Sequence, residues 1–252
     1  MIKIIAANWK NNGSKEFIKN YFEYFTKNLN NTNKNEIIFF PPDLYMDQID
    51  KYKKQSNFGM GGQNLHTAGS DFVLTSGTSS EMYIDNGCSY ILIGHSEIRQ
   101  FSYIERVTNE THTIKLSLQG SDSLQVIFCV GENESDKNAG DTYTILSKQL
   151  DDLSYLKVKP KKFIIAYEPV WAIGSGKIPT LEDISLIHKF IKDNILEKLP
   201  SLKEKDIMVL YGGSVNLKNA KDILSAPNVD GVLIGGASLE VEEFTSICNL
   251  KI

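Results

Sequence analysis

The sequence has few cysteines and no long apolar segment. Cys88, Cys129 and Cys248 are odd in number and far apart, which predicts reduced, mostly buried thiols instead of a disulfide framework. No segment reaches the roughly 18 apolar residues of a membrane-spanning helix, and the N-terminal MIKIIAANWK is too short an apolar run for a secretory signal. These absences predict a cytoplasmic protein with no membrane partner.

A strong excess of one charge and a dividing linker are also missing. The formal net charge of -4 argues weakly against a nucleic-acid partner, although a local positive pocket can still attract an anion. No Pro/Gly/Ser-rich linker and no fixed-period repeat interrupts the 252 residues. We therefore expect one domain over residues 1–252, a usual length for a single α/β barrel.

Short apolar runs recur along the chain. Most are continuous, which is typical of parallel strands that are covered on both faces. The expected strands are Ile2–Ala6, Ile37–Phe40, Phe58–Gly61, Tyr90–Ile93, Gln125–Val130, Phe163–Ala166, Ile207–Leu210 and Gly231–Ile234.

Helix-like segments lie between these runs. Residues 14–29 begin with Ser14 as N-cap, and residues 180–199 begin with Thr180 and Asp183 spaced as in a capping box. The stripe expected to face the core in the first segment is Phe17, Tyr21, Tyr24 and Phe25. Eight strands alternating with helices predict an α/β fold, a single (β/α)8 TIM barrel, with a doubly wound open sheet as the alternative.

Polar side chains gather directly after the apolar runs. In a (β/α)8 barrel the active site lies at the C-terminal ends of the strands, so these residues are the candidates for chemistry. They are Asn8, Lys10, Gln63, Asn64, His95, Glu97, Glu132 and Glu168. Each alone is an ordinary strand-end residue, but together on one rim they indicate a functional site.

Glycine pairs follow the last two runs, in YGGS at Tyr211–Ser214 and at Gly235–Gly236. Such pairs are either tight turns or anion sites, because exposed N–H groups before a helix suit a phosphate. Two pairs on neighbouring strands seven and eight, where barrels commonly bind phosphate, favour the phosphate site.

One histidine stands out from the others. His95 lies at the start of a short expected helix, whose dipole favours a neutral imidazole, whereas His66, His112 and His188 are expected to be incidental. No metal-ligand spacing and no G-x-S-x-G motif occurs in the sequence. We therefore expect no metal and no acyl-enzyme.

Six strings in the chain closely resemble those of the triosephosphate isomerase family. They are ANWK (Ala7–Lys10), IGHSE (Ile93–Glu97), CVGE (Cys129–Glu132), AYEPVWAIGSGK (Ala166–Lys177), YGGSV (Tyr211–Val215) and GGASL (Gly235–Leu239). They fall in order at strand ends over nearly the whole chain. The resemblance implies a cofactor-free isomerase of glycolysis and gluconeogenesis, acting on triose phosphates.

The resemblance also implies roles for single residues. Glu168 would remove a carbon-bound proton from dihydroxyacetone phosphate or glyceraldehyde 3-phosphate, and a neutral His95 would polarise the carbonyl. Lys10 would stabilise the enediolate and phosphate charge, with Asn8 near the substrate oxygens and Glu97 in contact with the lysine. The phosphate would be bound by Gly174, Ser214, Gly235 and Gly236.

The segment after Glu168 would be a lid that closes over the substrate. Its residues are Pro169, Val170, Trp171, Ala172, Ile173, Gly174, Ser175, Gly176 and Lys177. Residues 169–171 form one hinge and residues 177–179 the other, and Tyr211 and Ser214 match the residues that hold the lid shut.

The family is typically a homodimer, and the departures from its pattern concern assembly and the lid. Asn11 follows N-W-K where an apolar residue or cysteine is usual, and Pro179 ends a hinge that usually has another residue. In the interface near Thr75, charged residues of the family are replaced by Gly77, Ile98 and Ile104. We expect the dimer to persist with an apolar contact.

Two other functions stay open. A phosphate-binding barrel aldolase would form a Schiff base through Lys10. A catalytically idle homologue would act as a binding protein, and its usual mark is the loss of a base or electrophile. Against the second, the four expected groups are all present, namely Asn8, Lys10, His95 and Glu168.

Overall fold

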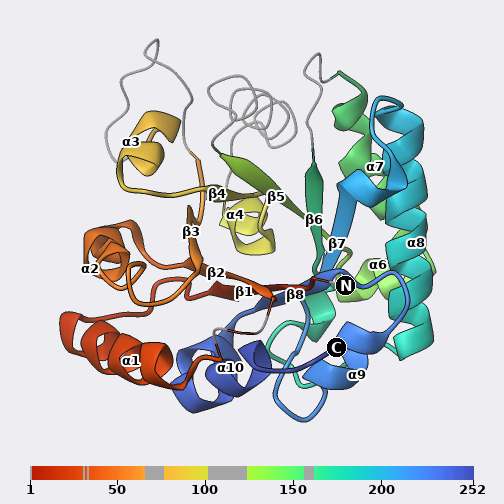
Figure 1. Ribbon diagram of the computed structural model, residues 1–252. Coiled ribbons are helices and arrows are strands. Elements are labelled where there is room, and N and C mark those ends of the chain that lie inside the picture. Colours follow the sequence, from red (N-terminus) through yellow and green to blue (C-terminus); the bar gives the residue numbers. More distant parts are fainter. Residues whose placement is uncertain (1, 31, 33, 66–76, 102–123, 156–161) are drawn as a thin grey trace.

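The computed structural model describes residues 2–30, 32, 34–65, 77–101, 124–155 and 162–252. Its eight strands are parallel and form one closed barrel in chain order (Figure 1). They are β1 Ile4–Asn8, β2 Glu36–Phe40, β3 Gly59–Gly62, β4 Tyr90–Ile93, β5 Gln125–Val130, β6 Phe163–Tyr167, β7 Ile207–Tyr211 and β8 Gly231–Ile234. The predicted barrel is confirmed, and the open-sheet alternative is wrong.

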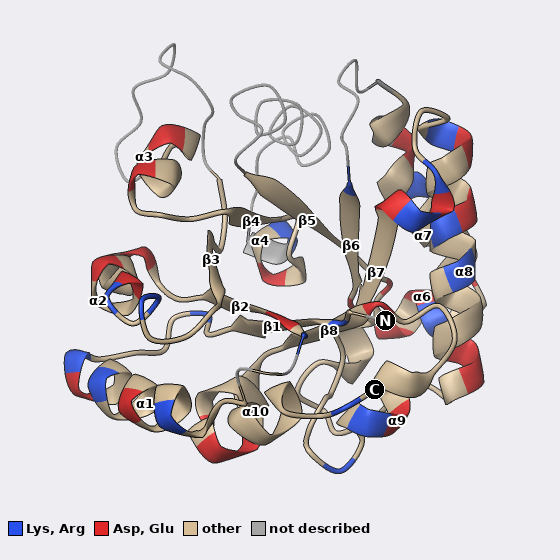
Figure 2. Cartoon of the chain, in the orientation of Figure 1, with Lys and Arg blue, Asp and Glu red and all other residues tan. Residues whose placement is uncertain are grey.

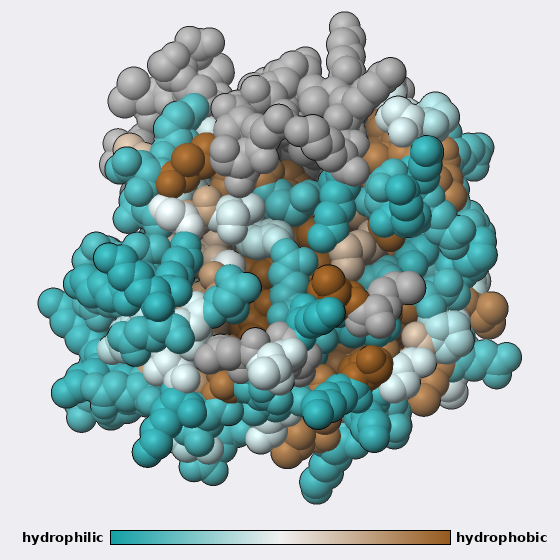
Figure 3. All heavy atoms as spheres, viewed as in Figure 1, coloured by the Kyte–Doolittle hydropathy of each residue, from teal (hydrophilic) through white to brown (hydrophobic). Residues whose placement is uncertain are grey.

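Helices cover the outside of the barrel. They are α1 Lys15–Asn28, α2 Met46–Asp50, α3 Ser80–Asp85, α4 Ser96–Phe101, α6 Glu134–Ala139, α7 Thr142–Asp151, α8 Leu181–Lys198, α9 Ala220–Ser225 and α10 Val241–Cys248. Short 3-10 segments are η1 Asp43–Tyr45, η2 Asp152–Tyr155, η3 Val170–Ala172, η4 Glu204–Asp206 and η5 Gly236–Leu239. Charged residues colour helices such as α1 and α8 but almost none of the strands (Figure 2), and the surface over α1 and α2 is hydrophilic (Figure 3).

Two apolar cores result from the alternation of side chains along the strands. Ile4 and Ala6 of β1 belong to the core inside the barrel, whereas Ile5, Ala7 and Trp9 belong to the core between barrel and helices. Because both faces of each strand are buried, nearly every strand position is apolar. The polar residues therefore begin where the strands end.

The predicted N-caps of two helices are confirmed, whereas one residue expected in the core is exposed. The Ser14 side chain accepts from Phe17 N at 3.0 Å, and the Thr180 side chain accepts from Asp183 N at 3.0 Å. The return bond of a capping box is replaced by one from the Thr180 hydroxyl to the Asp183 carboxylate, at 2.7 Å. Tyr24 is exposed, because the buried face of α1 is Ile18, Tyr21, Phe22 and Phe25.

Candidate active site

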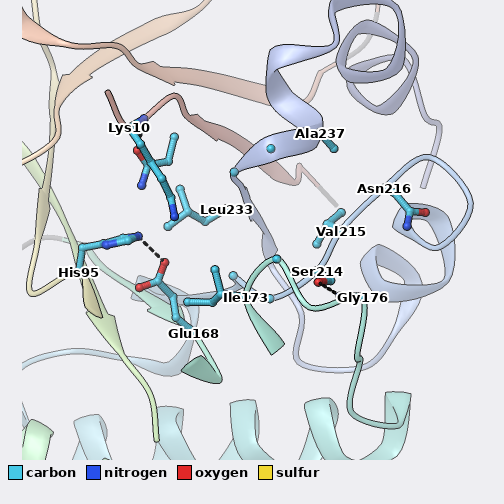
Figure 4. A pocket seen from close by; sticks show the side chains of 16 residues that line it. Lys10, His95, Glu168, Ile173, Gly176, Ser214, Val215, Asn216, Leu233 and Ala237 are labelled. Carbon is cyan, nitrogen blue, oxygen red and sulfur yellow. Dashed lines mark hydrogen bonds and ion pairs between the residues drawn. The ribbon is translucent and has the colours of Figure 1, made fainter. Parts of the chain in front are cut away.

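Glu168 follows the last residue of β6 and is 3 % exposed. Its Oε1 lies 3.3 Å from Nε2 of His95, which comes two residues after β4 (Figure 4). The glycines after β5 and β7 press against Glu168: a Cβ on Gly131 would lie 1.8 Å from its carbonyl oxygen, and one on Gly212 would lie 2.7 Å from its Cγ. The glycines that follow the neighbouring strands therefore fix the position of the Glu168 carboxylate, which faces the His95 imidazole.

Lys10 reaches into the same space from β1 (Figure 4). Its backbone has φ 52, a conformation that non-glycine residues rarely adopt. The Asn8 side chain accepts from Lys10 N at 3.1 Å, and Gln63 Nε2 donates to Lys10 O at 2.6 Å. Glu97 Oε1 lies 2.6 Å from Lys10 Nζ. The lysine is thus held at both its backbone and its ammonium group.

The electrostatics around His95 differ from the expectation. Burial lowers the pKa of His95, but the carboxylates of Glu168 and Glu97 outweigh burial, so the pKa is raised above its ordinary value. A short helix dipole does not overcome a carboxylate at contact distance. The backbone N–H of Glu97 points at His95 Nδ1 at 3.3 Å, which suits a ring that carries its proton on Nε2, facing Glu168.

One cavity of about 270 Å³ joins the expected catalytic and phosphate residues. The expected residues that line it are Asn8, Lys10, His95, Glu168, Gly174, Ser214, Gly235 and Gly236, with Ile173 and Gly176 of the lid. Glu97 contacts Lys10 but is not among the described residues that line this cavity. A Cβ on Gly236 would meet no atom within 4 Å, so the space beside its Cα is open and leaves room for an anion near the backbone.

One hydroxyl group binds the segment expected to form the lid at two places. Ser214 Oγ donates to Ala172 O at 2.6 Å. It also accepts from Gly176 N at 3.2 Å (Figure 4). Gly174 and Gly176 have φ of 64 and 75, which explains the small residues of this segment. By contrast, the buried Tyr211 hydroxyl has no hydrogen-bond partner among the described residues.

The sequence places Glu132 at the end of β5 among the candidate site residues but indicates no role for it. Its Oε1 accepts from Trp171 Nε1 at 2.8 Å and from the Tyr167 hydroxyl at 3.2 Å. Burial raises the pKa of Glu132, although these hydrogen bonds oppose the shift. Lys137 Nζ lies 3.3 Å from the centre of the Trp171 ring. Glu132 thereby anchors the first hinge of the lid to the end of β5.

Other sequence-based expectations fall partly outside the described residues. These include Thr75, Ile104, His66 and His112, whereas Gly77 and Ile98 are described. Ile98 on α4 is 39 % exposed, and Asn11 is exposed beside Lys10. His188 is fully buried in α8, away from the cavity.

The described part of the chain has neither a metal-ligand cluster nor a membrane-spanning helix. No group of three or more His, Cys, Asp and Glu residues there is placed to hold a metal ion. Among the same residues, no helix has the length and apolarity to cross a bilayer. The cysteines Cys88, Cys129 and Cys248 are buried thiols, as expected.

Known proteins match this chain over nearly its whole length. A family model described as triosephosphate isomerase matches residues 3–251. The triosephosphate isomerase of Hahella chejuensis is 39% identical over 246 residues, 97% of this chain and 96% of that protein. The enzyme of Francisella tularensis subsp. mediasiatica is 40% identical over 251 residues, 99% and 97% of the two chains, and that of Salmonella newport is 34% identical over 250 residues, 97% and 94%. With its barrel, this chain belongs to the triosephosphate isomerase family.

Proposed function

We propose that this chain interconverts dihydroxyacetone phosphate and D-glyceraldehyde 3-phosphate through an enediolate, with Glu168 as the base. The observation that carries the proposal is the single cavity in which Glu168 and His95 face each other beside Lys10 and the glycine-rich ends of β7 and β8. A carboxylate held by backbone contacts suits removal of a proton from carbon, because that step needs a rigidly placed base.

His95 acts as the electrophile in this proposal. A substrate carbon and its oxygens between the two side chains separate the Glu168 carboxylate from the imidazole, and that removes the main cause of the raised His95 pKa. The Nε2 proton then polarises the carbonyl and moves between the two oxygens, while Nδ1 stays bonded to the Glu97 N–H. A neutral His95 thus remains a prediction for the substrate-bound site.

Lys10 and Asn8 stabilise the charge that develops on the substrate. The ammonium group of Lys10 lies in the cavity, where a preorganised cation stabilises an enediolate more strongly than water does. Asn8 is 5 % exposed and hydrogen-bonds near the substrate oxygens. Glu97 orients the ammonium group by its contact with Lys10.

The phosphate group binds to the backbone of Gly174, Gly235 and Gly236 and to Ser214, all around one cavity. The lid then covers the substrate, with Ser214 as its latch on both sides of the turn. Tyr211 was expected to share the latch, and its partnerless hydroxyl gives that role no support within the described residues. Exclusion of water protects the enediolate from loss of its phosphate.

A barrel aldolase fits this site less well. Schiff-base chemistry needs a neutral lysine amine, whereas Lys10 Nζ lies 2.6 Å from the Glu97 carboxylate, a contact that suits the ammonium form. Borohydride trapping with substrate would label Lys10 in an aldolase, and the isomerase proposal predicts no label.

The direct experiment is a coupled isomerase assay on the purified protein, in both directions. Turnover of either triose phosphate without added metal or cofactor is the expected result. No turnover above the Glu168→Gln variant would instead favour the idle homologue, whose binding of phosphate compounds would survive.

We further propose that residues 1–252 form one barrel domain, that it assembles as a homodimer and that it works in the cytoplasm. The family membership and the continuous barrel support the first two proposals. The third rests on the cysteine usage discussed above.

A further inference from the structure

The backbone of Gly131 is in direct contact with the backbone of Glu168. A Cβ on Gly131 would lie 1.8 Å from the Glu168 carbonyl oxygen and 2.5 Å from its carbonyl carbon. Two backbone bonds frame this contact, Glu168 N to Val130 O at 2.7 Å and Val170 N to Glu132 O at 2.9 Å. A shift of Gly131 therefore moves the main chain that carries the carboxylate.

The peptide groups of Gly131 are held by a side chain. Strand β4 ends at Ile93, opposite Phe128, so β5 runs on past its neighbour before it reaches Gly131. Gln149 of α7 takes the place of the missing strand: its Oε1 accepts from Gly131 N at 2.8 Å, and its Nε2 donates to Gly131 O at 2.9 Å. One amide thus satisfies both the donor and the acceptor of one residue.

Apart from its contact with Glu168, Gly131 also borders open space. A second cavity, of about 260 Å³, is lined by Gly131, Gln149 and Glu168 together with residues of α4 such as Ser96. Atoms beside a cavity lack the close contacts that hold a protein interior in place. The two hydrogen bonds from Gln149 are then a main restraint on Gly131.

We propose that Gln149 is a positioning residue for the base, which holds Glu168 in line with His95 through the backbone of Gly131. The proposal rests on the assignment of Glu168 as the base. Gln149 is absent from the described lining of the substrate cavity, so its loss should affect the chemical step and leave substrate binding nearly intact. Misplacing a reacting group by a fraction of an ångström is costly in rate.

The first test is Gln149→Met, which keeps the length of the side chain and suits a helix but makes neither hydrogen bond. We expect kcat to fall roughly tenfold or more while KM changes by less than about twofold. The matched control is Gln125→Met at the other end of β5, where Gln125 Nε2 donates to Lys162 O at 2.9 Å. This control should lose a similar hydrogen bond and keep parental kcat.

A double variant separates positioning from a general structural effect. In a Glu168→Gln background the base is already gone, so Gln149→Met should cost little further activity. Parental kcat in Gln149→Met alone, or the same fold loss in both backgrounds, would overturn the proposal. High turnover in Glu168→Gln alone would instead refute the assignment of the base.

A second variant keeps the test decisive if Gln149→Met does not fold. Gln149→Glu retains the acceptor for Gly131 N–H and puts a carboxylate on the cavity that it shares with Glu168. This variant loses the donor to Gly131 O, so kcat should fall while KM stays nearly unchanged, as in Gln149→Met. Parental kcat in Gln149→Glu contradicts the proposal.

Discussion

At the scale of single residues, the proposed base is a buried carboxylate with incomplete partners. Oε1 of Glu168 faces His95, and Oε2 has no hydrogen bond among the described residues. A carboxylate oxygen that accepts no hydrogen bond is available to accept a proton from the substrate. The backbone of Lys10 is strained, with φ 52, and hydrogen bonds to the side chains of Asn8 and Gln63 hold it in this conformation.

Replacement of this base gives the first prediction. Glu168→Gln keeps the size of the side chain but removes the proton acceptor, so kcat should fall by roughly 10²–10⁴. Binding of a phosphate-bearing substrate analogue should survive better. Steady-state kinetics and analogue titration measure the two effects, with Glu197→Gln on the exposed side of α8 as control. Retention of more than about half the parental turnover would show that another group is the base.

His188 gives a prediction for the dependence of stability on pH. It is fully buried, with Nδ1 3.2 Å from Asn228 O, and burial lowers the pKa of His188 to about 3 from 6.5. Below pH 6.5 the unfolded chain binds a proton that the folded chain refuses. The contribution of His188 to the free energy of unfolding is therefore fully present above pH 6.5. It falls by up to about 1.4 kcal/mol per pH unit between pH 6.5 and 3.

The measurement is urea unfolding of the parent and of His188→Gln at pH 7, 6 and 5, at one protein concentration. The variant should be less stable at pH 7, since it disturbs a packed site, and the gap should narrow as the pH falls. A gap that is the same at all three pH values would mean that the pKa of His188 does not differ between the folded and the unfolded chain.

At the scale of elements, the lid is a short segment between two fixed ends. Its first hinge is anchored through Trp171 to Glu132, and its second hinge ends at Pro179, next to the N-cap Thr180 of α8. Lys177 Nζ also lies 3.0 Å from Glu134 Oε1 of α6, an exposed pair of small energetic weight. The freedom of the second hinge is therefore decided mainly by its backbone.

The lid prediction follows from this hinge. Proline fixes its own φ and biases Ile178 toward extended conformations, so Pro179→Ala should make the lid more mobile. Backbone relaxation of the amides of residues 174–177 measures the change, and an amide on α1 serves as internal reference. Equal relaxation in the parent and the variant counts against a role of Pro179.

At the scale of the whole molecule, the expected dimer depends on a surface that has lost its charges. Ile98 on α4 is 39 % exposed and follows Glu97, the partner of Lys10. Gly77 is described, whereas Thr75 and Ile104 lie outside the described residues. An apolar contact in place of an ion cluster is often neutral or stabilising, so the dimer should persist.

Restoring one charge of the cluster tests this assembly. Ile98→Arg should weaken the dimer, because a buried charge without its partners costs about 3–5 kcal/mol. Sedimentation at micromolar concentration, with Ile98→Leu as control, measures the dissociation. A fully active monomeric parent, or an Ile98→Arg protein as stable and dimeric as the parent, would refute the expectation.

The sequence by itself determined the barrel and which polar residues lie where its strands end. Strands buried on both faces are continuous apolar runs, so their ends, and with them Lys10, His95 and Glu168, were visible without coordinates. Even the glycines of β3 are explained locally, because a Cβ on Gly61 would lie 2.4 Å from the Phe40 ring inside the barrel. Such features depend on neighbours along a strand or on the adjacent strand.

Only the tertiary structure decided the pKa values of these residues and the hydrogen bonds that hold them in place. The raised pKa of His95 results from Glu168, which lies 73 positions away in the sequence and yet 3.3 Å away in space. The contact of Gln149 with Gly131 and the exposure of Tyr24 likewise depend on how helices pack on the barrel. Desolvation and hydrogen bonding act between atoms within a few ångströms, and for these pairs that proximity exists only after the barrel has closed.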